Sequence, residues 1–153
     1  MLVAPHFLVG TAIAVYAPEA WPVAGLAALT SHFVLDSIPH RDTIGGFHIN
    51  PANIIMELFD AIVTFGIFFA LVPKYLWLYG LLISGIAIFP DLLAIPWLFW
   101  PGWYQLPIIK PFHHWHTEIL QYDRGDINWF WGLLPQIIII GAVVYLLITK
   151  PLL

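Results

Sequence analysis

Charged residues and cysteines are scarce in this 153-residue chain. The absence of cysteine excludes disulfides, thiolate nucleophiles and cysteine-based zinc sites. Only 9% of the residues are charged, against about 25% in soluble domains, whereas 61% are hydrophobic and the mean hydropathy is +0.87. The five lysines and arginines form no basic stripe, which excludes a nucleic-acid-binding protein. The composition therefore predicts an integral membrane protein.

Familiar hydrolase motifs are missing as well. The chain has no serine nucleophile elbow, no glycine-rich phosphate loop and no His-Glu-x-x-His zinc motif. The stretch His113–Thr117 reads HHWHT, which lacks the glutamate that the zinc motif places between two histidines four residues apart. Any chemistry therefore depends on the five basic residues, nine acidic residues and seven histidines that the sequence does contain.

Apolar stretches of nearly membrane-spanning length dominate the chain. A bilayer core needs about 20 apolar residues per helix, within a range of roughly 17–25. Pro90 and Pro96 interrupt the fourth stretch, which predicts a kink or a break there. Residues 101–128 are too polar to cross freely but rich in aromatic side chains, which is typical of an interfacial or re-entrant segment. We expect one all-α integral-membrane domain over residues 1–153, a helical bundle of about five spans at Leu2–Ala17, Pro22–Ile38, Ile54–Val72, Tyr75–Trp100 and Trp129–Ile148.

Carboxylates and histidines recur inside these apolar stretches. Residues three or four apart share one helix face, and three such pairs are His32 with Asp36, Glu57 with Asp60, and His113 with His116. A carboxylate at the bilayer centre costs about 2.5–3.5 kcal/mol, and none of the five Lys and Arg residues lies within an expected span. A divalent metal would balance two carboxylates and would take neutral imidazoles as further ligands. The pattern therefore favours a metal site, and nitrogen and oxygen ligands without sulfur suit Zn, Mn, Fe or Ni, with Zn as the default.

The same polar residues also have purely structural interpretations, which stay open at this point. They would then be interfacial anchors, helix caps or solvated turns, as for His6, His40, Glu57, Asp91 and the 113–116 histidines. We expect solvated loop positions for His48, Asp123 and Asp126. The metal hypothesis instead assigns one or two divalent ions to His6, His32, Asp36, Asp60, Asp91, His113 and His116.

Several blocks of sequence resemble a known family. The blocks are His6 with Gly10-Thr11-Ala12, Ser31 to His40, Asp60, Pro90-Asp91, and His113-x-x-His116-Thr117. Together they resemble the membrane-bound metal-dependent hydrolases, also described as LexA-binding, inner-membrane-associated hydrolases. That family consists of small multi-helix proteins of bacterial and archaeal membranes. The resemblance covers most of residues 5–117, and the last apolar stretch adds hydrophobic bulk only. It implies a location in the prokaryotic cytoplasmic membrane and a hydrolytic activity.

The resulting hypothesis is a membrane-embedded metal-dependent hydrolase. We expect it to act on a phosphate ester or a related lipid-borne group at the interface, with membrane lipids rather than nucleic acid as its partners. His40 or Glu57, outside the metal ligands, would be the catalytic acid or base. Two alternatives stay open. One is a metal-ion or proton transporter or channel that uses the same His and Asp residues, and the other is a non-catalytic membrane protein stabilised by its metal.

Overall fold

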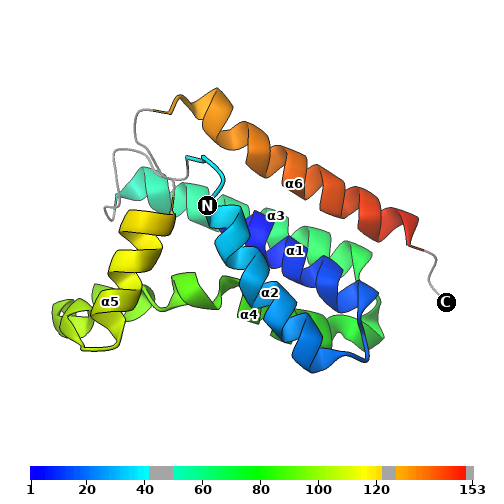
Figure 1. Cartoon of the computed structure of the whole chain (residues 1–153). Coiled ribbons are helices and arrows are strands. Elements are labelled where there is room, and N and C mark those ends of the chain that lie inside the picture. The colour runs from blue at the N-terminus through cyan, green and yellow to red at the C-terminus, as the bar shows by residue number, and fades with distance from the viewer. Residues whose placement is uncertain (42–49, 122–126, 151–153) are drawn as a thin grey trace.

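The computed structural model describes residues 1–41, 50–121 and 127–150, and every regular element in these ranges is helical. His48, Asp123 and Asp126 lie outside the described residues. In these ranges six α-helices are arranged as a bundle with a side arm (Figure 1). In chain order the elements are α1 (Val3–Tyr16), α2 (Trp21–Asp36), α3 (Pro51–Leu71), η1 (Lys74–Leu76), α4 (Trp77–Leu92), η2 (Ile95–Leu98), η3 (Pro101–Gln105), α5 (Ile109–His113), the π-helix η4 (His114–Leu120) and α6 (Trp129–Thr149).

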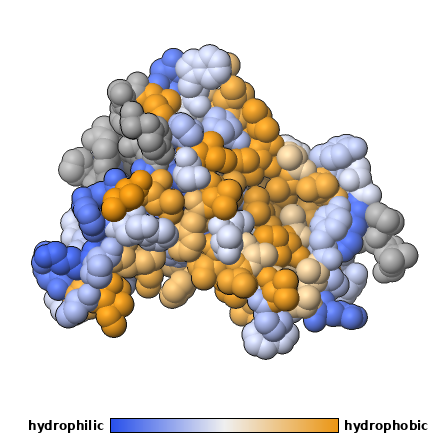
Figure 2. Space-filling view, viewed as in Figure 1, coloured by the Kyte–Doolittle hydropathy of each residue, from blue (hydrophilic) through white to orange (hydrophobic). Residues whose placement is uncertain are grey.

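Among the described residues, three helices are long and apolar enough to cross a membrane, namely Pro51–Leu71, Lys74–Leu92 and Trp129–Thr149. Figure 2 shows hydrophobic residues gathered across the middle of one face and hydrophilic residues mainly toward its edges. The five expected spans are not confirmed. Helices α1 and α2 have 14 and 16 residues, about 21 and 24 Å at 1.5 Å per residue, against a hydrocarbon core of about 30 Å.

Helix α1 occupies the centre of the bundle and contacts α2, α3, α4 and α6. Its Phe7 and Leu8 are buried against Phe68 of α3 and Val143 of α6. The first backbone N–H groups of a helix have no partner within the helix, and burial without partners would be costly. Here the Leu2 N–H donates to Gln136 Oε1 at 3.0 Å and the Ala4 N–H donates to Asp60 Oδ2 at 3.0 Å. Side chains of α6 and α3 therefore allow the start of α1 to be buried.

Helices α1 and α4 approach each other closely at Gly10. A Cβ atom added to Gly10 would lie 2.8 Å from the Ser84 Cα and 2.9 Å from the Ala87 Cβ, so only glycine fits. Beside this contact the hydroxyls of Thr11 and Ser84 are 2.9 Å apart and hydrogen-bonded. The contact fixes α4, and with it the Ala87 carbonyl, against the central helix.

Helix α4 includes Pro90 and ends at Leu92, so the fourth expected span is shorter than Tyr75–Trp100. Residues 95–120, called the arm below, follow as the short helices η2, η3, α5 and η4 and lie to one side of the bundle (Figure 1). The Trp103 indole donates to the Leu93 carbonyl at 2.6 Å, which ties the arm to the end of α4. Large apolar side chains of the arm, such as Phe99 and Ile108, are exposed, in keeping with the interfacial segment expected there.

Candidate metal centre

Two histidines and two aspartates converge where α2, α4 and the arm meet. His32 and Asp36 come from α2, Asp91 from the end of α4 and His116 from the π-helix η4. One ligand atom from each residue lies within 4.8 Å of all the others. The side chains of His32 and Asp36 are fully buried, that of His116 is 7% exposed and that of Asp91 is 27% exposed. The group is therefore closed on the bundle side and open at Asp91.

The distances within this group approach those of a coordination shell. His32 Nε2, His116 Nε2 and Asp36 Oδ2 form a triangle with sides of 3.0, 3.1 and 2.9 Å. Asp91 Oδ1 lies 3.7 Å from His32 Nε2 and 4.0 Å from His116 Nε2. Ligand atoms at about 2.0–2.2 Å from a tetrahedral zinc are about 3.3–3.6 Å apart. Small side-chain movements would bring all four atoms to these distances.

The backbone sets the tautomer of His32. Its Nδ1 lies 2.8 Å from the Ala87 carbonyl oxygen, which accepts hydrogen bonds only, so Nδ1 carries the proton. The Nε2 atom then presents a lone pair to the group. Metal-ligating histidines almost always have such a partner on the other ring nitrogen, because it fixes ring orientation and tautomer. A lone pair facing His116 Nε2 at 3.0 Å needs a shared proton or a cation between the rings.

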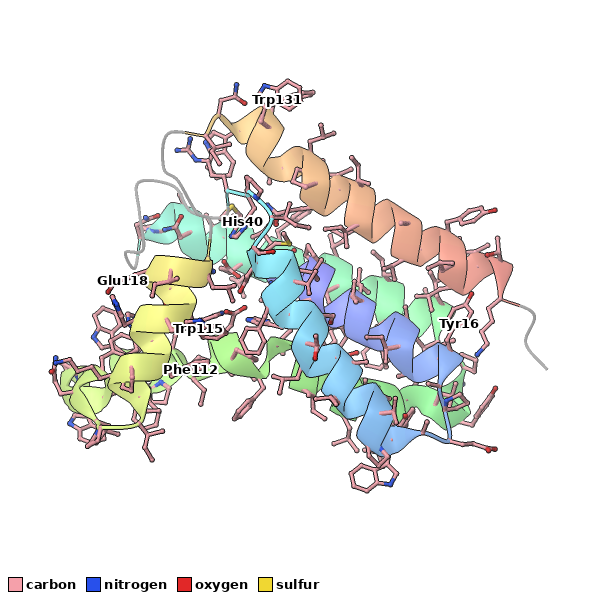
Figure 3. All side chains as sticks on the ribbon, in the orientation of Figure 1. Tyr16, His40, Phe112, Trp115, Glu118 and Trp131 are labelled. Atoms are coloured by element: carbon pink, nitrogen blue, oxygen red, sulfur yellow. The ribbon has the colours of Figure 1, made fainter. Side chains whose placement is uncertain are left out.

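Aromatic packing holds His116 in place. The Phe112 ring stacks on its imidazole at 5.5 Å with an interplanar angle of 17°, and the Phe33 ring of α2 lies 6.0 Å away. Trp115 contacts the same Phe33 at 5.2 Å. Figure 3 labels Phe112 and Trp115 on the arm, where they precede His116. Since π-helices occur frequently at functional sites, the π-helical turn that presents His116 is a further sign of a built site.

His6 lies beside the group, on the far side of Asp36. Its Nε2 is 3.1 Å from Asp36 Oδ1, and its ring centroid is 4.3 Å from that of His32. The Met1 amino nitrogen lies 3.2 Å from the same oxygen. Both oxygens of Asp36 therefore have nitrogen neighbours, and Asp36 is the central residue of the site.

Besides His6, the predicted site residues outside the four-residue group are Asp60, His40, Glu57 and His113. Asp60 is buried and accepts the Ala4 N–H, so its visible role is to cap α1. His40, labelled in Figure 3, is buried just after α2, and its Nδ1 donates to the Ile38 carbonyl at 2.8 Å. Glu57 is exposed on α3. The catalytic roles of His40 and Glu57 stay predictions.

His113 points elsewhere than its neighbour His116. Its ring lies 3.9 Å from the Tyr104 ring, and burial there lowers the pKa of His113 below its ordinary value. Burial likewise raises the pKa of the Tyr104 hydroxyl. The expectation that 113 and 116 share one face assumed a regular α-helix, whereas the chain changes from α5 to a π-helix at His114.

Gln136 is a residue that sequence reasoning missed. The last apolar stretch contributes more than hydrophobic bulk, because the buried Gln136 side chain accepts from the Leu2 N–H and donates to the Arg41 and Gly132 carbonyls. The signal was available, since an amide within an apolar helix needs partners.

No protein-family model, no curated protein and no solved structure matches this chain. The functional argument therefore depends on the geometry of the His and Asp residues.

Proposed function

We propose that the protein is a membrane-embedded metal-dependent hydrolase that acts on a phosphate ester of a lipid or a related lipid-borne group. The observation that supports this proposal is the group of His32, Asp36, Asp91 and His116, which is buried except at Asp91. Catalytic metal sites keep one coordination position open to water or substrate, and the partial exposure of Asp91 supports such an opening here.

The donor set fits a divalent ion. Two imidazole nitrogens and two carboxylate oxygens provide two negative charges, and they include no sulfur. This chemistry suits Zn, Mn, Fe or Ni, with Zn as our choice. When bound, such an ion lowers the pKa of a coordinated water and polarises a phosphoryl oxygen.

The residues around the group have separate roles in this proposal. The Ala87 carbonyl keeps the His32 proton on Nδ1, so that Nε2 is ready to bind. Asp91 is the partly exposed ligand and lies where water and substrate would enter. His40, whose Nδ1 proton is held by the Ile38 carbonyl, is the proposed acid or base, and Glu57 is the alternative.

The location of the open side supports a lipid-borne substrate. Asp91 lies at the end of α4, where the arm begins, and the arm carries exposed Phe99, Trp100 and Trp115. Tryptophan side chains such as those of Trp100 and Trp115 are enriched at the level of lipid headgroups. A phosphate ester in a headgroup would reach the open side of the group without leaving the membrane surface. We place the protein in the prokaryotic cytoplasmic membrane, as the family resemblance implies.

The experiment compares two histidines of the same π-helix. His116→Ala removes a ligand, whereas His114→Ala removes an exposed side chain that pairs with Glu118 at 2.7 Å. Protein purified in detergent with Zn²⁺ or Mn²⁺ supplied is analysed by elemental mass spectrometry. We expect wild type and His114→Ala to retain metal and His116→Ala to lose most of it. A folded wild type without metal would overturn the proposal.

Activity is measured with vesicles of phosphatidylcholine that contain phosphatidic acid or phosphatidylglycerol, by release of phosphate or of the headgroup. We expect release by wild type and His114→Ala, its loss with chelator, and its return when metal is added. Ion flux in liposomes without hydrolysis would overturn the hydrolase proposal and support the alternative of a metal-ion or proton transporter. Bound metal with neither hydrolysis nor ion flux would leave the remaining alternative, a non-catalytic membrane protein that its metal stabilises.

A further inference from the structure

The two oxygens of Asp36 face two different sets of nitrogen atoms. Oδ2 lies 3.1 Å from His32 Nε2 and 2.9 Å from His116 Nε2, within the four-residue group. Oδ1 lies 3.1 Å from His6 Nε2 and 3.2 Å from the Met1 amino nitrogen. The Asp36 side chain is fully buried, so neither oxygen can rely on bulk water for its partners.

His6 is the unexplained member of this arrangement. Its side chain is fully buried, and within the described residues neither ring nitrogen has a hydrogen-bond partner. The 3.1 Å between His6 Nε2 and Asp36 Oδ1 is a contact without hydrogen-bond geometry. Leaving a buried polar group unsatisfied carries a free-energy cost, because the group loses its hydrogen bonds to water without replacing them. A ligand that accepts the Nε2 lone pair and also attracts Oδ1 would remove this cost.

The charges around His6 are those of a cation site. The positive group that the structure places at Oδ1 is the Met1 ammonium, 3.2 Å away, and a divalent ion that binds this oxygen would displace it. Asp60 brings a further carboxylate to the first turn of α1, the turn that carries His6. In the described contacts of Asp36 and Asp91, the nitrogen partners are histidines, which are charged only when protonated, and the Met1 ammonium. A bound cation would supply the positive charge that lysine and arginine do not bring to Asp36 and Asp91 in these described contacts.

We infer that a second divalent cation binds on the Oδ1 side of Asp36, with His6 Nε2 as its other side-chain ligand and Asp36 bridging the two ions. The 3.1 Å between these two ligand atoms is close to the spacing of about 3.3 Å around one tetrahedral ion. A carboxylate that binds one ion through each oxygen suits a two-metal site, in which the ions are about 3.5–4 Å apart and act together on a phosphoryl group. The inference rests on the proposed function, because it places the second ion next to the first.

The first test is the spectrum of the unmutated protein. Full-length protein in detergent is loaded with Mn²⁺ and examined by electron paramagnetic resonance, which detects spin coupling between ions about 4 Å apart. We expect a coupled pair, and its absence in a fully loaded sample would overturn the second site. This measurement does not depend on whether any variant folds.

The second test counts ions per chain in four proteins. We expect two in wild type and in His114→Gln, the control at an exposed histidine, and one without spin coupling in His6→Gln. Asp91→Asn should lose the ion of the four-residue group before it loses the ion bound by His6. Zero ions in wild type would overturn the proposed function as well. One ion in both wild type and His6→Gln would overturn the second site alone, and two coupled ions in His6→Gln would overturn the role of His6.

Discussion

Gly10→Ala is the substitution whose effect on both fold and site can be derived from distances. An added Cβ would lie 2.8 Å from the Ser84 Cα and 2.9 Å from the Ala87 Cβ, whereas ordinary contacts begin at 3.4 Å. The added Cβ would lie about 0.6 Å too close to the Ser84 Cα and about 0.5 Å too close to the Ala87 Cβ. Helix α4 must therefore move away from α1, because a backbone atom and a Cβ cannot rotate aside.

This movement would reach the metal centre through Ala87. The Ala87 carbonyl accepts the His32 Nδ1 proton at 2.8 Å, and a shift of about 0.6 Å lengthens that bond enough to weaken it severely. Overpacking a core typically costs about 1–3 kcal/mol. Loss of the partner that orients a ligating histidine lowers metal affinity by about 10–100-fold. We expect both effects in Gly10→Ala.

The matched control is Gly85→Ala on α4, where an added Cβ meets nothing within 4 Å. Alanine favours a helix over glycine by up to about 1 kcal/mol, so this variant should be as stable as wild type or more stable. Thermal unfolding in detergent and titration with Zn²⁺ measure the two effects. Equal stability of the two variants would refute the packing argument. Destabilised Gly10→Ala with unchanged zinc affinity would refute the connection through Ala87.

Three further predictions concern the arm, α6 and pH. Chelation should increase amide exchange over residues 109–120 and leave α1 protected. His116→Ala should show the same increase without chelator, and equal exchange of the arm with and without metal would contradict the prediction. Gln136→Leu leaves the partly buried Leu2 N–H without its acceptor, which should cost about 1–3 kcal/mol of stability in thermal unfolding. The same measurement should detect no such loss for Gln105→Leu at an exposed position. Burial lowers the pKa of His113; the unfolded arm therefore binds the proton more readily, and arm stability should fall as pH drops below the ordinary value of 6.5, toward the lower folded pKa. Amide exchange of the arm at a series of pH values would show this fall, and a decline of the same size in His113→Gln would contradict the assignment.

The sequence predicted the parts of the site that lie within one helix or at its end. The spacing of His32 and Asp36 puts both on one face of α2, and both belong to the four-residue group. Pro90 marks the end of α4, which brings Asp91 to the same place. The spacing of His113 and His116 also predicts one shared helix face, and it therefore predicts both as site residues. This reasoning assumes a regular α-helix with 3.6 residues per turn, so it cannot distinguish His116 from His113. The π-helix breaks that assumption.

The central position of α1 could not be derived from hydropathy. Hydropathy reports how apolar a segment is, and it does not report which neighbours cover it. A 14-residue helix with a buried start depends on Asp60 and Gln136, which come from α3 and α6, far away in the sequence. The sequence pattern favours Asp60 as a metal ligand, and that role stays a prediction, because the contact in the structure is with the Ala4 N–H.

The four residues of the candidate metal centre are held with unequal strength, and this inequality indicates how an ion would enter. His32 and Asp36 are fixed on α2, whose Ala28 packs against Ala87 of α4, and both are fully buried. His116 comes from the arm, and packing against Phe33 and Phe112 helps to hold it there. Asp91 is the most exposed ligand of the group. An ion that enters past Asp91 would bind Asp36 and His32 at fixed positions and His116 last, so metal binding would draw the arm onto the bundle.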